Sequence, residues 1–401
     1  MPDDGASFLT SGDVQPLLES AVEYGGGLLL NWELEHVDQT PNQSTTATYR
    51  AEVRWPHGVR TELFGVSARA GEMTETDSNA HIFFDGSRRV AVWLYPKDPD
   101  LPGLQRAAFA DGMVEVLNSG GIFPTRLTAE ELTLEMIGYR PRRRAVVQVD
   151  ARGRRFYVKV LRPHLADDII GKHRMLAESH FPGPRVLMST EDHLLVTEKL
   201  PGIPLAKALF EPGEPCTAED IIATLDSMPQ QVATLDRRQP WAASVGYYGR
   251  MVRLSAPELE ADVDWLVETI ERGLAHIPQG DEPTHGDFHE GQVHVAGGRL
   301  LGVLDVDTIG PGGRADDLAC LIGHLATIQR MNPAQEARVR EILALWVPVF
   351  DQRVDPVELR LRAAAVILSL ATGPYRSQEH DWREQTHAMV KSALALVKQV
   401  V

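Results

Sequence analysis

The chain has 401 residues, which is long enough for two or three domains. Because its formal net charge is −16, neither nucleic acid nor an anionic membrane is expected as its partner. Its longest apolar runs are too short to span a bilayer, and its N-terminus lacks the basic start and apolar run of a signal peptide. Since its two cysteines, Cys216 and Cys320, lie far apart in the sequence, no disulfide framework is expected, and we predict a cytoplasmic protein.

The first part of the chain reads as a small β-rich subdomain. Short runs that alternate in polarity or carry β-branched and aromatic residues are separated by turn signals, which predicts an antiparallel meander. The predicted strands are residues 28–37, 45–55, 61–68 and 89–95. Two helical stretches follow, one opening near residue 100 and one over residues 111–117. Because no metal, nucleophile or phosphate motif occurs here, we interpret residues 1–125 as a structural cap.

A second set of strands is predicted at residues 132–137, 145–149 and 155–161. Lys159 lies in the last of them, where a lone cation in an apolar strand needs a partner. The next helix is predicted over residues 166–178, and its one glutamate, Glu178, is our candidate partner, with His173 or an aspartate as alternatives.

Between the first two of these strands lies an arginine-rich loop, Arg140 to Arg144, with a single glycine before it. Without a glycine-rich backbone, the loop cannot wrap phosphates through its amides. Its arginines could contact phosphates through their side chains, or the loop could be an ordinary solvated turn.

The rest of the chain is mainly helical in pattern. Residues 194–200 form one more buried strand, which ends at Pro201 and Gly202. Beyond residue 204, apolar residues recur at spacings of three and four, which indicates amphipathic helices. The predicted helices are residues 218–237, 256–276, 315–330, 333–350, 356–371 and 382–400.

The stretch from residue 284 to residue 318 interrupts this helical pattern with a predicted hairpin. Residues 292–295 and the apolar run 300–304 are strand-like, and Gly297 and Gly298 between them are typical of a two-residue turn. A hairpin brings its two ends together. We therefore expect Gln292 and Asp305 to lie close in space, near the loop that carries Asp287.

These residues are the set that phosphoryl transfer from a nucleotide needs. A carboxylate must orient and deprotonate the acceptor hydroxyl, and two oxygen ligands must hold magnesium against the phosphates. Asp287 suits the first role, while Gln292 and Asp305 suit the second, with Asp307 as a further metal candidate. Protein kinases place the same five-residue step between the aspartate and the metal-binding amide of their catalytic loop.

Three motifs resemble those of the aminoglycoside phosphotransferase and choline kinase superfamily. They are His285-Gly286-Asp287, Leu304-Asp305-Val306-Asp307 and Ala315-Asp316-Asp317-Leu318-Ala319. Gln292 replaces the usual asparagine, a departure shared with bacterial maltokinases and with actinobacterial sugar kinases of the glucosamine kinase type. The resemblance is strong across the C-terminal half of the chain and plausible from about residue 132 onward.

The resemblance implies an α+β, protein-kinase-like bilobal fold preceded by a β-rich cap subdomain. A small β-rich N-lobe would span residues 126–202 and bind the nucleotide, and a mainly helical C-lobe would span residues 203–401. Maltokinases carry an N-terminal cap of similar size, to which residues 1–125 correspond in architecture.

The resemblance also implies roles for individual residues, with ATP and Mg²⁺ as cofactors. Lys159, paired with Glu178, would meet the α- and β-phosphates. The backbone from Glu198 to Leu200 would be the hinge that contacts adenine. His285 and Asp317 would support the catalytic loop without touching substrate.

The acceptor is expected to bind between the last two predicted helices. Glu379 and Asp381 lie beside Trp382 there, and carboxylates next to an aromatic ring suit hydroxylated or cationic ligands. The alternative is a capping segment in which Asp381 is the N-cap of the last helix. Glu290, in the catalytic loop, is a second candidate for accepting a hydrogen bond from an ammonium group.

We therefore predict an ATP-dependent kinase for a hydroxyl of a small sugar, with an amino sugar such as glucosamine as the favoured acceptor, acting as a monomer or homodimer. A maltokinase-like or an aminoglycoside-inactivating kinase would need the same catalytic parts, so the core motif cannot choose among them. A catalytically inactive, kinase-like nucleotide-binding protein is the alternative of another class, suggested by the glycine-poor loop and by Gln292.

Overall fold

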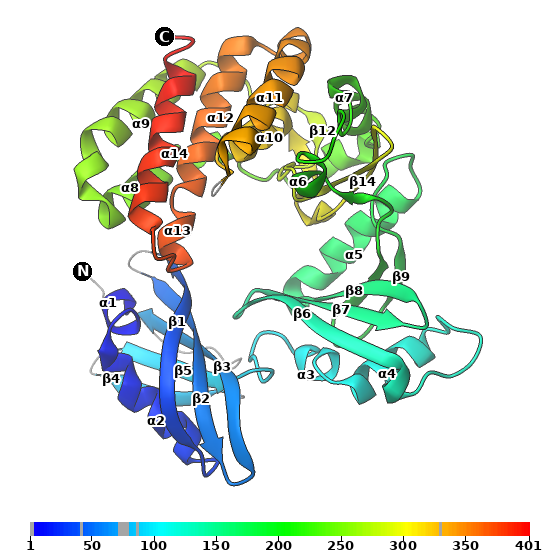
Figure 1. The fold of residues 1–401 in the computed structure, drawn as a ribbon, viewed down its shortest axis with the longest axis vertical. Coiled ribbons are helices and arrows are strands. Elements are labelled where there is room, and N and C mark those ends of the chain that lie inside the picture. Colours follow the sequence, from blue (N-terminus) through cyan, green and yellow to red (C-terminus); the bar gives the residue numbers. More distant parts are fainter. Residues whose placement is uncertain (1–3, 41–42, 71–79, 86–87, 329–330) are drawn as a thin grey trace. The chain divides into compact units, whose positions relative to one another are not determined.

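The computed structural model describes residues 4–40, 43–70, 80–85, 88–328 and 331–401 (Figure 1). The chain divides into two compact units. Unit 1 contains residues 1–170, 186–199 and 376–378, and unit 2 contains residues 171–185, 200–375 and 379–401. Among the described residues, none of the helices has the length and apolar character that a membrane span requires.

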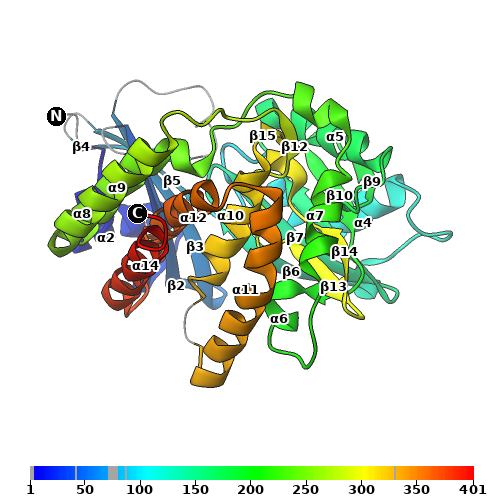
Figure 2. The same ribbon diagram turned by 90° about the horizontal axis from the view of Figure 1, so that it is seen from above.

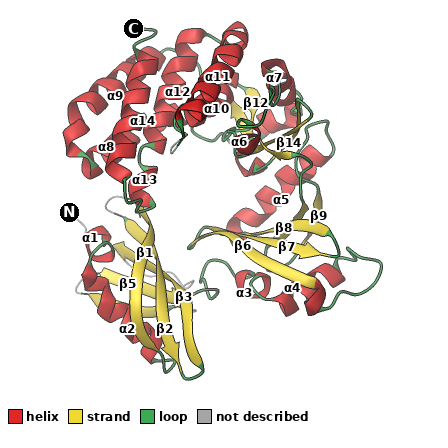
Figure 3. Cartoon of the chain, viewed as in Figure 1, coloured by secondary structure: helices red, strands yellow, loops and turns green. Residues whose placement is uncertain are grey.

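Unit 1 begins with a five-stranded antiparallel sheet (Figure 3). Its order is β1 (Leu28–Thr40), β2 (Ser44–Trp55), β3 (Gly58–Ala70), β5 (Arg88–Leu94) and β4 (His81–Asp85). The short α1 (Ala6–Leu9) and the longer α2 (Gln15–Glu23) share one apolar core with this sheet. The predicted meander is present, but the edge strand β4 and helix α2 were not predicted.

A second antiparallel sheet in unit 1 has the order β6 (Leu132–Arg140), β7 (Arg144–Ala151), β8 (Arg154–Val160), β10 (Leu194–Glu198) and β9 (Val186–Ser189). Helices α3 (Leu104–Ala107) and α4 (Ala110–Ser119) share a core with this sheet, through residues such as Met113 and Phe156. Leu195 belongs instead to a cluster with Ile169 and Ile170 of α5 (Pro163–Ala177). The two sides of this sheet are therefore covered by helices from different parts of the chain.

The arginine-rich loop is a tight turn in the structure, because β6 ends at Arg140 and β7 begins at Arg144. Arg142 has a positive φ of 60° and is only 4% exposed. Its backbone N–H donates to Asp98 Oδ2 (2.8 Å), its guanidinium lies 3.3 Å from Asp100 Oδ1, and it stacks 5.0 Å from the centre of the Trp93 ring. Arg142 therefore serves the packing of unit 1, which favours the structural alternative for this residue.

Asp38 on β1 pairs with two arginines within unit 1. Its carboxylate lies 3.3 Å from His36 Nε2 and 3.9 Å from Arg143 Nε, and it pairs with Arg376. Burial alone would raise the pKa of Asp38, but the hydrogen bond with His36 and the charges of the two arginines outweigh burial and hold the pKa well below its usual range.

We expect Asp38→Asn to lower the free energy of unfolding by about 1–3 kcal/mol at neutral pH, because it removes a largely buried carboxylate that pairs with His36 and the two arginines. A carboxyl with a depressed folded-state pKa stabilises the fold above its unfolded value of 3.8, and that contribution is lost as the pH falls below this value. Denaturant unfolding of both proteins should therefore show a gap at neutral pH that narrows in acid. A gap of constant size across this range would contradict the assignment.

Unit 2 is mainly helical. Its longer helices are α7 (Ala218–Asp226), α8 (Val245–Ser255), α9 (Glu260–Leu274), α10 (Arg314–Leu325), α11 (Pro333–Arg353), α12 (Pro356–Leu370) and α14 (Trp382–Val397). Helix α12 packs against both α10 and α14 (Figures 1 and 2), and most of its residues are buried. Its start is defined by Asp355, whose Oδ1 accepts from the N–H groups of Val357 and Glu358.

Two helix predictions were wrong in extent. The helix predicted over residues 218–237 ends at Asp226, since Pro229 follows closely and cannot continue a helix; residues 230–234 form a 3₁₀ turn instead. The helix predicted over residues 256–276 covers only residues 260–274, and the preceding α8 was not predicted.

The predicted hairpin is present in unit 2, formed by β13 (Val293–Ala296) and β14 (Arg299–Val303). Gly297 and Gly298 both have positive φ, at 59° and 73°, as a two-residue primed turn requires. The short strand β11 (Ile203–Pro204) pairs with β13, and β12 (Glu282–Thr284) pairs with β15 (Gly310–Gly312). Residues 285–292, between β12 and β13, form a loop at the open end of the hairpin.

Candidate active site

The open end of the hairpin brings Gln292 beside the segment that carries Asp305. Val293 pairs with Val303, and the backbone N–H of Leu304 donates to the carbonyl oxygen of Gln292 at 2.7 Å. Asp305 comes next and has left-handed backbone angles, with φ 54° and ψ 51°. Such a conformation costs a non-glycine residue about 1–3 kcal/mol, and residues that adopt it are enriched at active sites.

The 285–292 loop is held to its neighbours by hydrogen bonds. His285 is fully buried, and its Nε2 donates to the carbonyl oxygen of Leu304 at 2.8 Å. Thr308 Oγ1 donates to the His285 carbonyl oxygen at 2.8 Å. Gly286 has φ +79°, and a Cβ at this position would lie 2.7 Å from the Thr308 carbonyl oxygen. Only glycine fits here without displacing one of the two segments.

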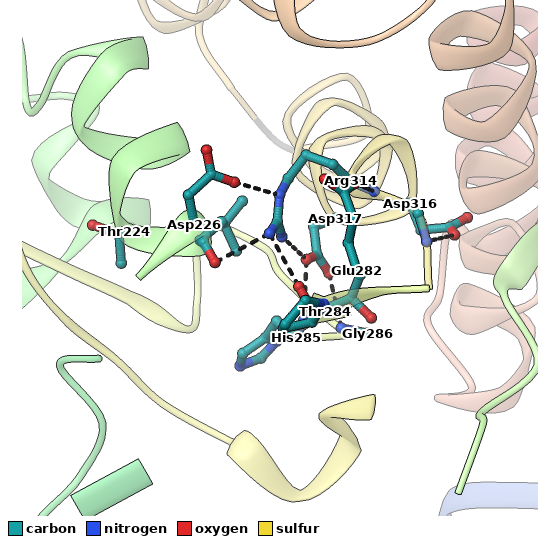
Figure 4. A network of polar contacts seen from close by, with 12 residues as sticks. Thr224, Asp226, Glu282, Thr284, His285, Gly286, Arg314, Asp316 and Asp317 are labelled. Carbon is teal, nitrogen blue, oxygen red and sulfur yellow. Dashed lines mark hydrogen bonds and ion pairs between the residues drawn. The ribbon is translucent and has the colours of Figure 1, made fainter. Parts of the chain in front are cut away.

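A buried ion pair anchors the same loop from the side of α10 (Figure 4). Asp317 is fully buried, and its carboxylate accepts from the backbone N–H groups of His285 (3.0 Å) and Gly286 (2.8 Å). Arg314 Nη1 donates to Asp317 Oδ2 at 2.9 Å, and Arg314 Nη2 donates to the carbonyl oxygens of Leu225 and Pro283. The carboxylate of Asp317 therefore accepts three hydrogen bonds, two of them from the backbone of the loop.

Beyond Asp287, an imidazole of the loop lies face to face with an imidazole of α10. The rings of His289 and His324 are 4.2 Å apart and inclined by 8°, and a ligand atom of each lies within 4.8 Å of a carboxylate oxygen of Asp287. Burial lowers the pKa of both histidines, that of His324 to about 3. Burial also raises the pKa of Glu290 to about 7. None of the sequence patterns marked His324, which lies on α10.

Asp307 lies beside the last part of α5. Lys172 Nζ donates to the backbone carbonyl oxygen of Asp307 at 2.9 Å, and Nε2 of the buried His173 is 3.7 Å from Asp307 Oδ1. His173 was an alternative partner for Lys159, and the structure shows it facing Asp307.

Lys159 lies on β8 in unit 1, opposite Val146 of β7 and Leu195 of β10. It alternates with Phe156, Val158 and Val160, which are fully buried, so its side chain leaves the sheet on the other face.

The sequence predicted that Glu178 lies within the helix after that strand, but in the structure it lies just beyond the end of the helix. Helix α5 ends at Ala177 and the side chain of Glu178 is exposed, so the carboxylates within the helix are those of Asp167 and Asp168. The pairing of Lys159 with Glu178 remains a prediction.

The predicted hinge begins in unit 1 with Glu198, whose Oε1 lies 2.6 Å from Arg154 Nη2. The backbone N–H of Lys199 donates to the Arg155 carbonyl oxygen at 3.2 Å. Leu200, in unit 2, is buried against Gly302 of the hairpin, where a Cβ would lie 2.8 Å from Leu200 Cδ1.

The three predicted acceptor residues come together at the start of α14. Gln385 Nε2 donates to both Glu379 Oε2 (2.8 Å) and Asp381 Oδ1 (2.7 Å), so one amide lies between the two carboxylates. The Trp382 ring packs edge-on against Tyr375, with centres 5.1 Å apart. Asp381 occupies the N-cap position of α14 but makes no side-chain capping hydrogen bond, which weakens the capping alternative.

An arginine that the sequence analysis did not single out also reaches the 285–292 loop. Arg238 Nη1 donates to the Gly286 carbonyl oxygen at 3.2 Å, and the guanidinium stacks 4.9 Å from the centre of the Trp241 ring. Both residues lie between the helices predicted over residues 218–237 and 256–276, where nothing in the apolar pattern distinguishes them.

The model of the phosphotransferase enzyme family (APH) matches residues 138–350, which is more than half of the chain. The chain belongs to this family. The matched range contains the hairpin, the 285–292 loop and the Arg314–Asp317 pair of this phosphotransferase. No curated protein sequence matches the chain.

Solved structures similar to this phosphotransferase include a macrolide 2′-phosphotransferase from Brachybacterium faecium, with 20% identity, 70% of this chain and 98% of that chain covered, and a TM-score of 0.42. A putative aminoglycoside phosphotransferase from Ralstonia eutropha has 15% identity, coverages of 67% and 93%, and a TM-score of 0.45. A choline/ethanolamine kinase family protein from Mesorhizobium loti has 18% identity, coverages of 66% and 88%, and a TM-score of 0.47.

The α+β fold class predicted from the sequence is confirmed: the phosphotransferase is β-rich in its N-terminal part and mainly helical in its C-terminal part.

Proposed function

We propose that this phosphotransferase transfers the γ-phosphoryl group of ATP, with Mg²⁺, to a hydroxyl group of a small sugar, and that an amino sugar such as glucosamine is its preferred acceptor. The observation that carries the proposal is the closure of the hairpin by the bond between Leu304 N–H and the Gln292 carbonyl oxygen. This bond joins the backbone of Gln292 to that of Leu304, which precedes Asp305, at the end of the hairpin that follows the loop of Asp287.

The donor set at this end suits magnesium. Mg²⁺ takes hard oxygen ligands from a few protein groups and keeps water and phosphate oxygens for the rest. Asp305 and Gln292 offer such oxygens, and Asp307 follows two residues later on a 3₁₀ turn. A magnesium ion held there would neutralise charge on the β- and γ-phosphates. Because glutamine is one methylene longer than the usual asparagine, the geometry at the metal would differ slightly from that of the asparagine enzymes.

Asp287 is the group we assign to the acceptor. Its carboxylate orients the sugar hydroxyl and accepts its proton as the hydroxyl oxygen forms a bond to the γ-phosphorus. The bond between that phosphorus and the β–γ bridging oxygen breaks, and ADP leaves with the electron pair. We assign Lys159 to the α- and β-phosphates, and the backbone from Glu198 to Leu200 to the adenine.

The preference for an amino sugar follows from the carboxylates of unit 2. Glu379 and Asp381 share the neutral amide of Gln385, and the ring of Trp382 stands beside them. Carboxylates accept hydrogen bonds from ammonium and hydroxyl groups, and the ring offers an apolar face for a sugar. Glu290 is a further acceptor near Asp287.

The test is a screen for ADP release with glucosamine, N-acetylglucosamine, maltose, glucose and several aminoglycosides. Glucosamine is expected to give the highest kcat/KM. Turnover with maltose or an aminoglycoside in its place would show one of those alternative activities, and nucleotide binding without turnover on any acceptor would show a catalytically inactive protein.

The double variant Glu379→Gln, Asp381→Asn is expected to raise KM for the amino sugar by about 10-fold to 100-fold, the equivalent of losing charge-assisted hydrogen bonds, while KM for ATP stays within about twofold. Initial rates over a range of acceptor concentrations measure this. Glu384→Gln, an exposed carboxylate on the same helix, is the matched control and should change neither constant. An equal rise in KM for amino and neutral sugars would contradict recognition of the ammonium group.

A further inference from the structure

Glu290 has a buried carboxylate oxygen that lacks a hydrogen-bond partner. Oε2 of this residue is shielded from solvent, 3.8 Å from His289 Nδ1 and 3.7 Å from His324 Nδ1, and both distances are too long for hydrogen bonds. Within the described parts of the chain, the basic side chains next to this carboxylate are these two imidazoles. Leaving such a group unsatisfied is costly, so a buried carboxylate between two imidazoles indicates a missing ligand.

The imidazoles offer lone pairs rather than charge. Burial lowers the pKa values of both rings, which favours their neutral form. The Gly291 N–H donates to His289 Nδ1 at 3.1 Å, which shows that this nitrogen carries a lone pair. Ligand atoms of Asp287, His289 and His324 lie within 4.8 Å of one another, and the Glu290 carboxylate borders both imidazoles. Imidazole and carboxylate ligands together are typical of zinc and similar ions. Magnesium, which prefers oxygen ligands, is not suited to such a set.

We propose that His289, His324 and Glu290, together with Asp287, form a second cation site that takes Zn²⁺ or a similar divalent transition metal ion, distinct from the oxygen ligands Gln292 and Asp305. Occupation requires two small adjustments. His324 turns about its Cβ–Cγ bond, because parallel stacked rings cannot both direct an in-plane lone pair at one ion, and this torsion is soft. His289 gives up its hydrogen bond with Gly291.

Binding at this site has a consequence for catalysis, and this part rests on the proposed function. A metal ion bound to Asp287 occupies the carboxylate that we assign to the acceptor hydroxyl. Zn²⁺ therefore inhibits the transfer by competing with the acceptor, whereas the affinity for ATP and Mg²⁺ is unchanged. The site makes the phosphotransferase sensitive to transition metal ions through the acceptor side of its catalytic loop.

The first experiment measures binding without any activity assay. The full chain is titrated with Co²⁺, whose visible absorption reports tetrahedral nitrogen and oxygen ligands, and Zn²⁺ affinity is measured against a chromophoric chelator. We expect one ion per chain, and an affinity at least about 100-fold weaker in His324→Ala and in Glu290→Gln. His276→Ala, an exposed histidine on the same unit, is the control and should bind as the parent does.

Two results would overturn the site: no absorption change with Co²⁺ in the parent protein, or equal Zn²⁺ affinity in the parent, His324→Ala and Glu290→Gln proteins. Circular dichroism of each variant tests whether a loss of binding is caused by a loss of fold. If His324→Ala unfolds, Glu290→Gln still tests the site, because glutamine keeps the shape of the side chain. Because this readout needs no acceptor, it stands even if the screen for ADP release finds no substrate.

The second experiment tests the inhibition, with each variant compared with itself in the presence and absence of Zn²⁺. Inhibition should be competitive with the acceptor and at least about 10-fold weaker in His324→Ala, in line with the lost ligand. Inhibition that persists undiminished in His324→Ala and is relieved by excess Mg²⁺ would place zinc at Gln292 and Asp305 and refute the proposed mechanism of inhibition.

Discussion

Replacing Asp287 with asparagine is expected to lower kcat by about 10²-fold to 10⁴-fold, the range by which a positioned general base accelerates proton transfer. Asparagine keeps the shape of the side chain and can still contact a hydroxyl group, but it cannot accept the proton. The KM for ATP should change little, because the nucleotide is assigned to other residues. Initial rates of ADP release at saturating ATP and acceptor measure the effect.

The control for this variant is Asp262→Asn, an exposed aspartate on α9 that has no assigned role. It should retain the parental kcat. Calorimetric titration with ATP and Mg²⁺ shows whether Asp287→Asn still binds nucleotide, which separates a lost base from a disordered loop. Retention of more than about a tenth of the parental kcat by Asp287→Asn would refute its role as the base.

The hairpin beside this loop could be predicted because its signals are local. Two adjacent glycines with positive φ lie between short apolar runs, and the strand period then determines which residues meet at the open end. The neighbourhood of Gln292 and Asp305 follows from this register. The left-handed backbone of Asp305 does not, since neither the strand period nor the turn specifies it.

The residues around the loop could not be predicted in the same way, because their partners are distant in sequence. Arg314 donates to Leu225, 89 positions away, and Asp317 accepts from His285, 32 positions away. A pattern of apolar spacing shows that α10 has a buried face, but it does not show which polar side chains on that face meet a loop from elsewhere. His324 was overlooked for the same reason.

The errors in element boundaries have a related cause. Apolar spacing continues past Asp226 to the buried Val232, so periodicity alone predicts one long helix, while Pro229 forces a 3₁₀ turn that buries the same side chain. Arg142 is a second example. A run of arginines in a turn is typical of a solvated surface, but Asp98, Asp100 and Trp93 convert its second arginine into a packed residue.

Asp317→Asn is expected to lower the free energy of unfolding by about 3–5 kcal/mol, the cost of removing one partner from a buried ion pair. The substitution leaves Arg314, only 3% exposed, without its buried counter-charge. It also turns an amide toward the backbone N–H groups of His285 and Gly286, so that one of them loses its acceptor. Denaturant unfolding measures the stability, and hydrogen exchange at residues 285 and 286 reports the loosening of the loop.

Asp226→Asn is the matched control, because Asp226 Oδ1 lies 3.2 Å from Nε of the same arginine but its side chain is 42% exposed. Because solvent screens the attraction between this exposed carboxylate and Arg314, Asp226→Asn should lower the free energy of unfolding by less than about 1 kcal/mol. If the two variants lose similar stability, the buried position of Asp317 does not determine its contribution. If Asp317→Asn alone is unstable and its amides at residues 285 and 286 exchange faster, the ion pair of α10 is what holds the loop of Asp287 in place.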